Sequence, residues 1–219
     1  MRCVVTAGPT FEPLDEVRRL TNFSTGRLGT ELACHLSALG HGVTLLRGEM
    51  AVWPAGAAVE AGVQVASFRS AADLRTLLLR EAGGEVGAVF HAAAVSDFAF
   101  GRVWRRGAGE SLIAVQAGKL STRDGVLLVE LLPTTKIILE LRGWFPRAWL
   151  VGWKYVVDGG RDAAIERGRS QLRECRTDVC VVNGPAYGPG FGVLRADSSC
   201  VHAEDQVQLR SVLAQGVGQ

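Results

Sequence analysis

The stretch RCVVTAGPT (residues 2–10) decides how the first half of this chain folds. β-branched residues fill its centre and Gly-Pro follows, which predicts a short buried strand over Arg2–Ala7 that ends in a turn. Leucines then recur at spacings of four, four and three within Gly26–Leu39, so this segment is predicted to be a helix. Gly40–Gly42 is predicted to end this helix, and a second apolar run over Val43–Arg47 is the next predicted strand. The three elements form a strand–helix–strand unit.

The same alternation continues along the chain. Ser70 is predicted to cap a helix, with Asp73 at the capping-box position. Further helices are predicted near Thr134–Trp144, Arg161–Cys175 and Gln206–Ala214. The remaining predicted strands are Val63–Phe68, Val86–Ala92, Val126–Leu131, Trp149–Lys154 and Val179–Asn183, followed by a loop at Tyr187–Phe191 and a hairpin of Val193–Ala196 with Cys200–Ala203.

Strands that alternate with helices at this spacing require crossover connections and a parallel sheet covered on both faces. We therefore predict an α/β fold, a Rossmann-like, doubly wound and mostly parallel sheet with a small β-rich elaboration. Phe98–Gly125 is rich in Gly and Arg and has no clean periodicity, so it is interpreted as a flap, flexible over about residues 99–125. Residues 1–219 are expected to form a single domain.

Composition excludes several classes of protein. The 219 residues contain 24 Lys+Arg and 22 Asp+Glu, a net charge of +2, which gives no support to a nucleic-acid-binding surface. No apolar run approaches the length of a membrane span, and the N-terminus is interpreted as a strand, not a signal peptide. Five scattered cysteines without a CxxC pair indicate neither a zinc site nor a disulfide framework. A cytoplasmic protein with reduced, mostly buried thiols is expected.

Candidate site residues follow the predicted strands, because ligands of open α/β sheets bind beyond the carboxyl ends of the strands. Gly8 follows the first strand, and Gly26 and Gly29 open the first helix, where backbone N–H groups can approach an anion. The gap between Gly8 and Gly26 is too long for a GxGxxG dinucleotide fingerprint. An ordinary glycine-tolerant loop is the alternative.

The fourth strand ends in His91 and three alanines, followed by Ser96 and Asp97. The alanines leave room for a flat ligand, and Asp97 is suited to a ribose hydroxyl, a metal or a turn cap. His91 is interpreted as a satisfied strand-end histidine rather than a catalytic base.

The chain has only three lysines, Lys119, Lys136 and Lys154. Lys119 lies in the irregular segment, where a loop lysine could neutralise a polyphosphate or simply be solvated. Lys154 closes an apolar strand, where a charge is costly to bury unless it is paired. A lysine that points at an anionic site explains this position better than a structural ion pair.

Several motifs together resemble the phosphopantothenate–cysteine ligase (phosphopantothenoylcysteine synthetase) family. These are, in the family's order, TAGPT (6–10), EPLD (12–15), VR (17–18), NFSTGRLG (22–29), AAAVSDF (92–98), GKLS (118–121), VGWK (151–154) and VVN (181–183) followed by GFG (190–192). The resemblance covers nearly the whole chain. It implies a stand-alone ligase that joins 4′-phosphopantothenate to cysteine through an acyl-nucleotide in coenzyme A biosynthesis, with CTP or ATP as co-substrate.

The resemblance also implies roles for individual residues. Asn22 would hold the acyl-nucleotide, Arg18 would support that loop, and Lys119 would neutralise phosphate charge. The nucleotide would be bound by Gly8, Ser24, Gly26, Gly29, Ala93, Asp97, Trp153 and Lys154. Mg²⁺ would be carried by the nucleotide phosphates rather than by a protein site. No flavin, nucleic acid or membrane is expected as a partner. The chain is expected to form a homodimer.

Two alternatives compete with the ligase. A nucleotide-binding Rossmann-type oxidoreductase is disfavoured, because GxGxxG is absent and neither Tyr155 nor Tyr187 belongs to a Tyr-x-x-x-Lys pair. A catalytically degenerate family member that binds a nucleotide without turnover is disfavoured by the presence of both Asn22 and Lys119.

Overall fold

The computed structural model describes residues 1–218 and, for Glu110, only the backbone. Its central sheet has eight strands in the order β13-β12-β11-β10-β6-β1-β4-β5. The strands from β5 to β11 run parallel, and β12 and β13 form an antiparallel hairpin at one edge. Their bounds are β1 Arg2–Ala7, β4 Gly42–Gly48, β5 Gln64–Phe68, β6 Ala88–His91, β10 Trp149–Tyr155, β11 Val179–Asn183, β12 Phe191–Arg195 and β13 Cys200–Ala203. The predicted doubly wound α/β fold is confirmed.

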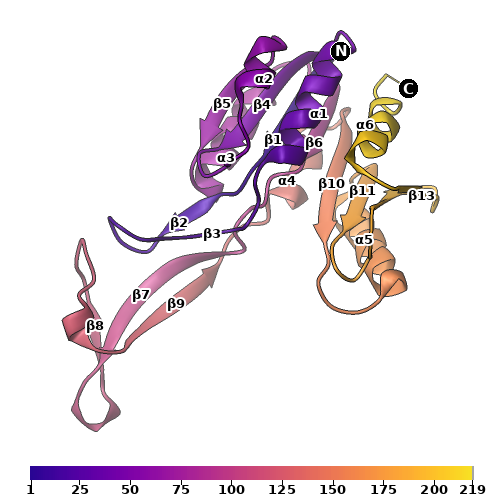
Figure 1. Cartoon of the computed structure of the whole chain (residues 1–219). Coiled ribbons are helices and arrows are strands. Elements are labelled where there is room, and N and C mark those ends of the chain that lie inside the picture. The colour runs from indigo at the N-terminus through magenta and orange to yellow at the C-terminus, as the bar shows by residue number, and fades with distance from the viewer. Residues whose placement is uncertain (219) are drawn as a thin grey trace.

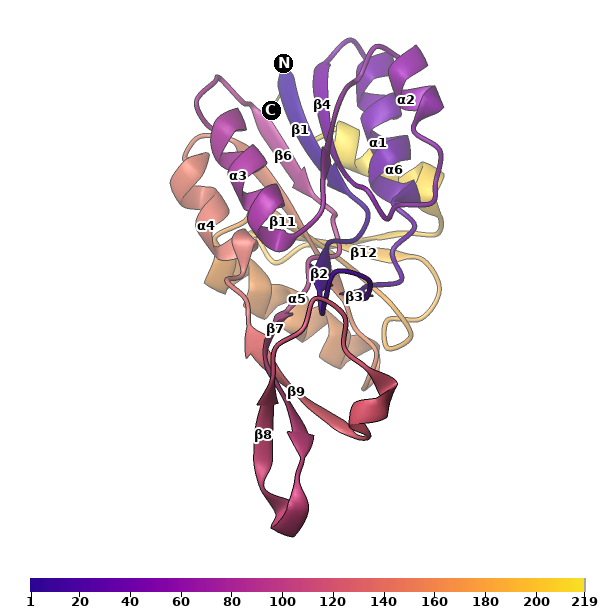
Figure 2. The ribbon, with the colours of Figure 1, turned by 90° about the vertical axis from the view of Figure 1, so that its left-hand side faces the viewer.

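Helices cover both faces of this sheet (Figures 1 and 2). The helices α1 (Arg27–Ala38), α2 (Gly56–Glu60) and α6 (Gln206–Ala214) pack on one face, and α3 (Ala71–Glu81), α4 (Ile137–Trp144) and α5 (Arg161–Cys175) pack on the other. Central strands are apolar on both sides because successive side chains point to opposite faces, each of which is buried. In β1, for example, Val5 belongs to the core under α1 and Val4 to the core under α3 and α4.

The predicted capping box of α3 is present. The Ser70 hydroxyl accepts a hydrogen bond from the backbone N–H of Asp73, and the Asp73 side chain accepts one from the N–H of Ser70. By contrast, α4 begins at Ile137, three residues later than the predicted start at Thr134. Thr134 is held in an extended segment instead, because its N–H donates to the carbonyl of Asp97 (2.9 Å) and its hydroxyl to the carbonyl of Ser96 (2.6 Å).

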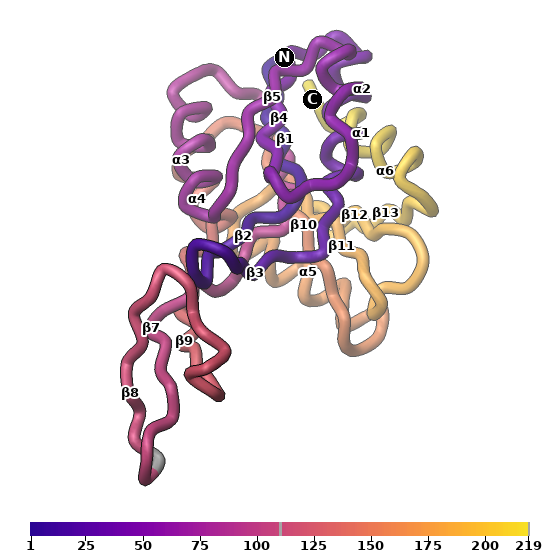
Figure 3. Tube along the Cα trace, turned by 60° about the vertical axis from the view of Figure 1, so that its left-hand side comes forward, coloured from indigo at the N-terminus to yellow at the C-terminus, as the bar shows by residue number. Residues whose placement is uncertain are grey.

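The irregular segment and the strand predicted at Val126–Leu131 together form a second sheet that projects from the main body (Figures 1 and 3). Its strands are β7 (Phe98–Arg106), β8 (Leu112–Val115) and β9 (Leu127–Pro133), in the order β8-β7-β9, with short 3₁₀ turns at Ala108–Glu110 and Thr122–Asp124. Most of its side chains are partly or fully exposed, so no buried face imposed an alternating pattern on the sequence. A register shift between Phe100 and Val103 interrupts the pattern further. Its flexibility remains a prediction.

A small hairpin links the main sheet to this projecting sheet. Its strands β2 (Phe11–Pro13) and β3 (Arg19–Thr21) have three residues each, too short for a periodic signal. All five cysteines are free thiols; four of them are buried or partly buried, and Cys200 is exposed. None of the helices within residues 1–218 has both the length and the apolar character needed to cross a bilayer.

Candidate functional site

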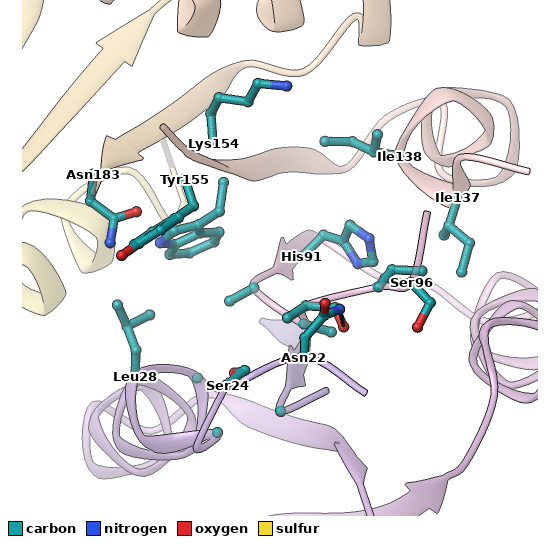
Figure 4. A pocket seen from close by; sticks show the side chains of 18 of the residues that line it. Asn22, Ser24, Leu28, His91, Ser96, Ile137, Ile138, Lys154, Tyr155 and Asn183 are labelled. Atoms are coloured by element: carbon teal, nitrogen blue, oxygen red, sulfur yellow. Dashed lines mark hydrogen bonds between the residues drawn. The ribbon is translucent and has the colours of Figure 1, made fainter. Parts of the chain in front are cut away.

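A cavity of about 830 Å³ lies at the carboxyl ends of β1, β6, β10 and β11 (Figure 4). This volume is typical of a small-molecule site. The strand order reverses direction between β1 and β6, which is where doubly wound sheets bind their ligands. The cavity is therefore the candidate site.

The predicted glycine loop forms one wall of the cavity. Gly8 and Gly26 have φ of 81° and 79°, a left-handed conformation that favours glycine. A Cβ on Gly29 would lie 2.6 Å from the Cβ of Ala7, so glycine lets α1 approach β1 closely. The N-cap residue of α1 is Gly26, which has no side chain to cap the helix, although the Thr25 hydroxyl accepts from the N–H of Arg27 (3.3 Å). The other N–H groups of the first turn and the positive end of the helix dipole make this wall suitable for an anion.

The segment after β6 forms the adjoining wall and is joined to the glycine loop by hydrogen bonds. The N–H of Ala94 donates to the carbonyl of Gly8 (3.0 Å), and the N–H of Thr10 donates to the carbonyl of Ala94 (3.1 Å). The Thr10 hydroxyl accepts from the N–H of Ser96 (2.8 Å) and donates to its Oγ (3.0 Å). These buried contacts fix the two walls relative to one another.

Asn22 lies in the cavity next to both walls, and its Nδ2 donates to the carbonyl oxygen of Ala94 at 3.0 Å. The side chain is exposed, so its amide oxygen remains available to a ligand. Ser24 lies close by in the same lining, as Figure 4 shows.

His91 is buried at the end of β6 with 6% of its surface exposed. Its Nδ1 lies 3.1 Å from the Thr6 hydroxyl, which also accepts from the N–H of Ala93. Burial lowers the pKa of His91 to about 4, so the ring is neutral at pH 7. This geometry suits the structural role that the sequence indicated.

The structure brings together all eight predicted nucleotide-binding residues. Gly8, Ser24, Gly26, Gly29, Ala93, Asp97, Trp153 and Lys154 line the same cavity as Asn22. Asp97 is exposed at its edge. Trp153 and Lys154 occupy opposite faces of β10, because Trp153 packs on the α1 side and side chains alternate along a strand.

Arg18 and Lys119 lie elsewhere, outside the cavity lining as far as the described residues define it. The Arg18 guanidinium donates to Asp15 (2.6 Å) and to the carbonyl of Leu120 (2.6 Å), and Leu120 N–H donates to Asp15 (3.1 Å). Burial opposes ionisation of Asp15, but hydrogen bonds from the N–H groups of Leu120 and Val17 and from Arg18 hold its pKa well below the usual range. Arg18 thus fastens the loop that carries exposed Lys119 to the small hairpin.

Several lining residues were not assigned a role from the sequence. They include Lys136, Tyr155, Gln171, Asn183, Phe191 and Gln206. Asn183 and Phe191 stand in the quoted motifs VVN (181–183) and GFG (190–192), and Lys136 is one of only three lysines. Tyr155, Gln171 and Gln206 are ordinary positions whose location depends on the tertiary fold.

These features define a class, the doubly wound α/β proteins with a ligand cavity at the switch point and an uncapped helix N-terminus beside it. The family described as the DNA/pantothenate metabolism flavoprotein C-terminal domain matches residues 1–214. The chain belongs to this family.

Curated relatives agree with this assignment. The coenzyme A biosynthesis bifunctional protein CoaBC of Bacillus subtilis is 34% identical over 201 residues, 90% of this chain and 43% of that protein. A cysteine/cysteine sulfinic acid decarboxylase from an unknown prokaryotic organism is 31% identical over 193 residues, 87% of this chain and 48% of that protein. The chain thus spans less than half the length of these relatives.

The fold itself recurs in solved structures. The DNA/pantothenate metabolism flavoprotein of Streptococcus pneumoniae superposes with a TM-score of 0.82 at 23% identity, over 98% of this chain and 97% of that one. A Cab2 mutant in complex with phosphopantothenate-cysteine superposes with a TM-score of 0.73 at 18% identity, over 98% and 85% of the respective chains.

Proposed function

We propose that this chain forms the amide bond between 4′-phosphopantothenate and cysteine, using a nucleoside triphosphate. The single observation that carries the proposal is the cavity, in which Asn22, the glycine loop and the Ala93–Asp97 segment line one site. The chain that forms this cavity belongs to the family that matches residues 1–214. The name of the Bacillus subtilis relative supplies the pathway, coenzyme A biosynthesis, and the motif resemblance supplies the two substrates.

In the first step, a carboxylate oxygen of 4′-phosphopantothenate attacks the α-phosphorus of the nucleotide. The bond to the β-phosphate oxygen breaks and pyrophosphate leaves. Ser24, Gly26 and Gly29 at the N-terminus of α1 are placed to hold phosphate oxygens, since backbone N–H groups there are free to donate. Lys119 lies outside the cavity lining in this structure, and its ammonium would neutralise developing charge when the loop that carries it approaches the phosphates.

In the second step, the cysteine amine attacks the acyl carbon of the acyl-nucleotide. The carbon–oxygen bond breaks, the nucleoside monophosphate leaves with the bridging oxygen, and the amine loses a proton to water. The Asn22 amide would orient the acyl-nucleotide, because one side-chain amide both donates and accepts. Its bond to Ala94 keeps the amide beside the wall where the acyl group would lie.

The nucleoside would lie between Asp97, which can accept hydrogen bonds from ribose hydroxyls, and Trp153, whose ring can lie beside the base. We assign CTP or ATP as the nucleotide.

Mg²⁺ belongs to the substrate, carried on its phosphates. Within residues 1–218, no group of three or more His, Cys, Asp or Glu side chains is arranged to hold a metal ion. The reaction transfers no electrons, so it has no need of a flavin.

A homodimer is part of this proposal. Apolar side chains of the projecting sheet, among them Leu112, Ile113, Leu131 and Leu132, are exposed, which is typical of a surface that packs against another chain. A second copy of the chain is the expected partner, because closed symmetric dimers are the commonest assemblies.

The free thiols favour a cytoplasmic location.

One relative is named as a decarboxylase, but this chain matches only 48% of it. The family that matches here is described as a C-terminal domain, so we assign the ligase and not the decarboxylase activity to this part.

Release of pyrophosphate tests the proposal. The protein is incubated with 4′-phosphopantothenate, Mg²⁺ and each of the four nucleoside triphosphates, with and without cysteine. We expect release that requires phosphopantothenate, and amide product only when cysteine is added. No release with any nucleotide would overturn the proposal and favour a nucleotide-binding protein without turnover.

A further inference from the structure

Three polar side chains meet at the β12–β13 edge of the main sheet, and none of them is among the described residues that line the cavity. Arg161 is the first residue of α5, Tyr187 lies in the loop between β11 and β12, and His202 belongs to β13. These elements lie on the side of the molecule away from the projecting sheet (Figures 1 and 3). Arg161, Tyr187 and His202 are here called the clamp.

Hydrogen bonds and ring contacts join the three side chains. The Nη2 group of Arg161 donates to the Tyr187 hydroxyl (2.8 Å) and lies 3.0 Å from Nδ1 of His202. The Tyr187 hydroxyl also lies 3.0 Å from this nitrogen. The guanidinium lies over the Tyr187 ring, 4.3 Å from its centroid, and the rings of Tyr187 and His202 stack with centroids 5.9 Å apart. The clamp therefore joins α5, the β11–β12 loop and β13 at one point.

The donors of the clamp determine the protonation of His202. An arginine guanidinium only donates hydrogen bonds. Burial raises the pKa of Tyr187, although the hydrogen bond from Arg161 opposes this, so the hydroxyl keeps its proton at neutral pH. Nδ1 of His202 is thus the acceptor for both groups, and the ring proton lies on Nε2.

Glycines let the clamp pack against the start of β12. Gly190 has a φ of 79°, and a Cβ there would lie 2.6 Å from Cε1 of His202. A Cβ on Gly192 would lie 2.7 Å from the Tyr187 ring. Phe191, between the two glycines, points to the opposite face of the sheet and packs on the α1 side. The GFG motif (190–192) therefore has the clamp on one face of β12 and Phe191 on the other.

The clamp lies behind one wall of the cavity. Asn183 and Phe191 line that wall, and they flank the loop 184–190 that carries Tyr187. The loop after β10 is attached to the same segment, because the N–H of Val156 donates to the carbonyl of Asn183 (2.8 Å). Release of Tyr187 would therefore loosen the segment that positions Phe191.

We propose that Tyr187 is a positioning residue for the nucleotide, held by Arg161 and by neutral His202, and that it acts through Phe191. This inference rests on the ligase function proposed above, which places the nucleoside beside Trp153. Phe191 packs on the same side of the sheet as Trp153, so a shift of Phe191 changes the space open to the base. Loss of the clamp therefore weakens nucleotide binding and leaves the reaction of the bound nucleotide unchanged.

The clamp also makes nucleotide binding depend on pH, because histidine is the side chain that ordinarily changes protonation between about pH 5 and 8. A proton on Nδ1 of His202 removes the acceptor and places a second positive charge beside Arg161. Tyr187 is the other ionisable group in contact with this ring, β12 presents uncharged Gly192 opposite it, and exposed Cys200 lies on its own strand. Nucleotide affinity is therefore highest with neutral His202 and falls as the pH is lowered.

Calorimetric titration of CTP and of ATP with Mg²⁺, without phosphopantothenate, measures this binding in the absence of turnover. Tyr187→Phe keeps the ring and removes the hydroxyl, and we expect the Kd for the nucleotide to rise about fivefold, the usual effect of losing a hydrogen bond. His202→Phe should have a similar effect, whereas His202→Asn retains an acceptor and should recover most of the affinity. His41→Asn, between α1 and β4, is the matched control and should bind as the wild type does.

The pH profile separates positioning from a merely structural role. Between about pH 8 and 5, the Kd of the wild type should rise about fivefold more than that of His202→Asn, because residue 202 titrates only in the wild type. In steady-state kinetics, Tyr187→Phe should raise the KM for nucleotide with kcat within about twofold of the wild type.

Equal Kd values for wild type and Tyr187→Phe, or parallel pH profiles for wild type and His202→Asn, would overturn the proposal. A lower kcat with an unchanged KM for nucleotide would also overturn it. If the wild type binds nucleotide but releases no pyrophosphate with phosphopantothenate, the ligase function fails, and the ratios of the Kd values still decide whether the clamp positions the nucleotide.

Discussion

Asn22 donates its side-chain amide hydrogen to the carbonyl oxygen of Ala94 at 3.0 Å, which joins the loop after β1 to the segment after β6. These segments lie 72 positions apart in the sequence and meet where the sheet order reverses. The contact places a polar amide at the centre of the proposed reaction and fixes its orientation through a backbone group.

Replacement of Asn22 with alanine should separate the two half-reactions. The acyl-nucleotide should still form, because the phosphate-binding wall at α1 is intact, but its conversion to amide should slow by about a hundredfold, the effect of losing one preorganised polar group. Rapid quench and mass spectrometry of the acyl-nucleotide measure both steps. Unchanged rates for both would show that Asn22 has no role in the chemistry.

The buried ring of His91 should titrate far below an ordinary histidine. NMR of the imidazole should give a pKa of about 4, because burial disfavours the charged form. Thr6→Val should leave this value low, since burial and not the Thr6 hydroxyl is its cause. A pKa near 6.5 would contradict the structural role.

The same shift predicts how stability depends on pH. The unfolded chain binds a proton at His91 near pH 6.5 and the folded chain only near pH 4. The stabilisation by the neutral ring is therefore complete above about pH 6.5 and is lost as the pH falls toward 4, by roughly 3 kcal/mol. Urea unfolding across this pH range should show the fall in the free energy of unfolding. In His91→Gln, the part of this fall that comes from the titration of residue 91 should be absent.

Loss of the Asp15 carboxylate should release the loop that carries Lys119. In Asp15→Ala, the N–H of Leu120 loses its acceptor and Arg18 loses its ion pair, so hydrogen exchange at Leu120 should accelerate. Turnover should fall as Lys119 becomes misplaced. Glu16→Gln is the control, because it retains the backbone bond from Glu16 to Gly118. Equal exchange rates in wild type and Asp15→Ala would refute this anchoring role.

The exposed apolar side chains of the projecting sheet should mediate dimer formation. Light scattering should give twice the chain mass of 23.4 kDa for the wild type and the single-chain mass for Leu131→Asp. Val207→Asp, at an exposed apolar position on α6, should remain dimeric. A monomeric wild type, or a dimeric Leu131→Asp, would contradict this interface.

The main sheet could be predicted from the sequence because its strands are buried on both faces. Arg2–Ala7 and Val179–Asn183 have the predicted bounds, and so does the helix Arg161–Cys175. Of the projecting sheet, the strand predicted at Val126–Leu131 is present as β9 (Leu127–Pro133). The strands β7 and β8 and the β2–β3 hairpin were not predicted, because exposed strands lack the periodicity that burial imposes.

The site was predictable where chemistry follows a strand directly, as at Gly8 and Asp97. It was not predictable where the fold decides which face a residue occupies. Trp153 and Lys154 are adjacent in sequence but lie on opposite faces of β10. Gln206 reaches the cavity only because α6 begins at the same edge of the sheet.

Transfer of oxygen from substrate to nucleotide tests the acyl-nucleotide pathway most directly. Phosphopantothenate labelled with ¹⁸O in its carboxylate is converted with cysteine and the preferred nucleotide. The ¹⁸O content of the nucleoside monophosphate is then measured by mass spectrometry. We predict one ¹⁸O in the monophosphate, because the bridging oxygen leaves with it when the amide forms. Unlabelled monophosphate, or label found in inorganic phosphate, would contradict attack of the carboxylate on the α-phosphorus.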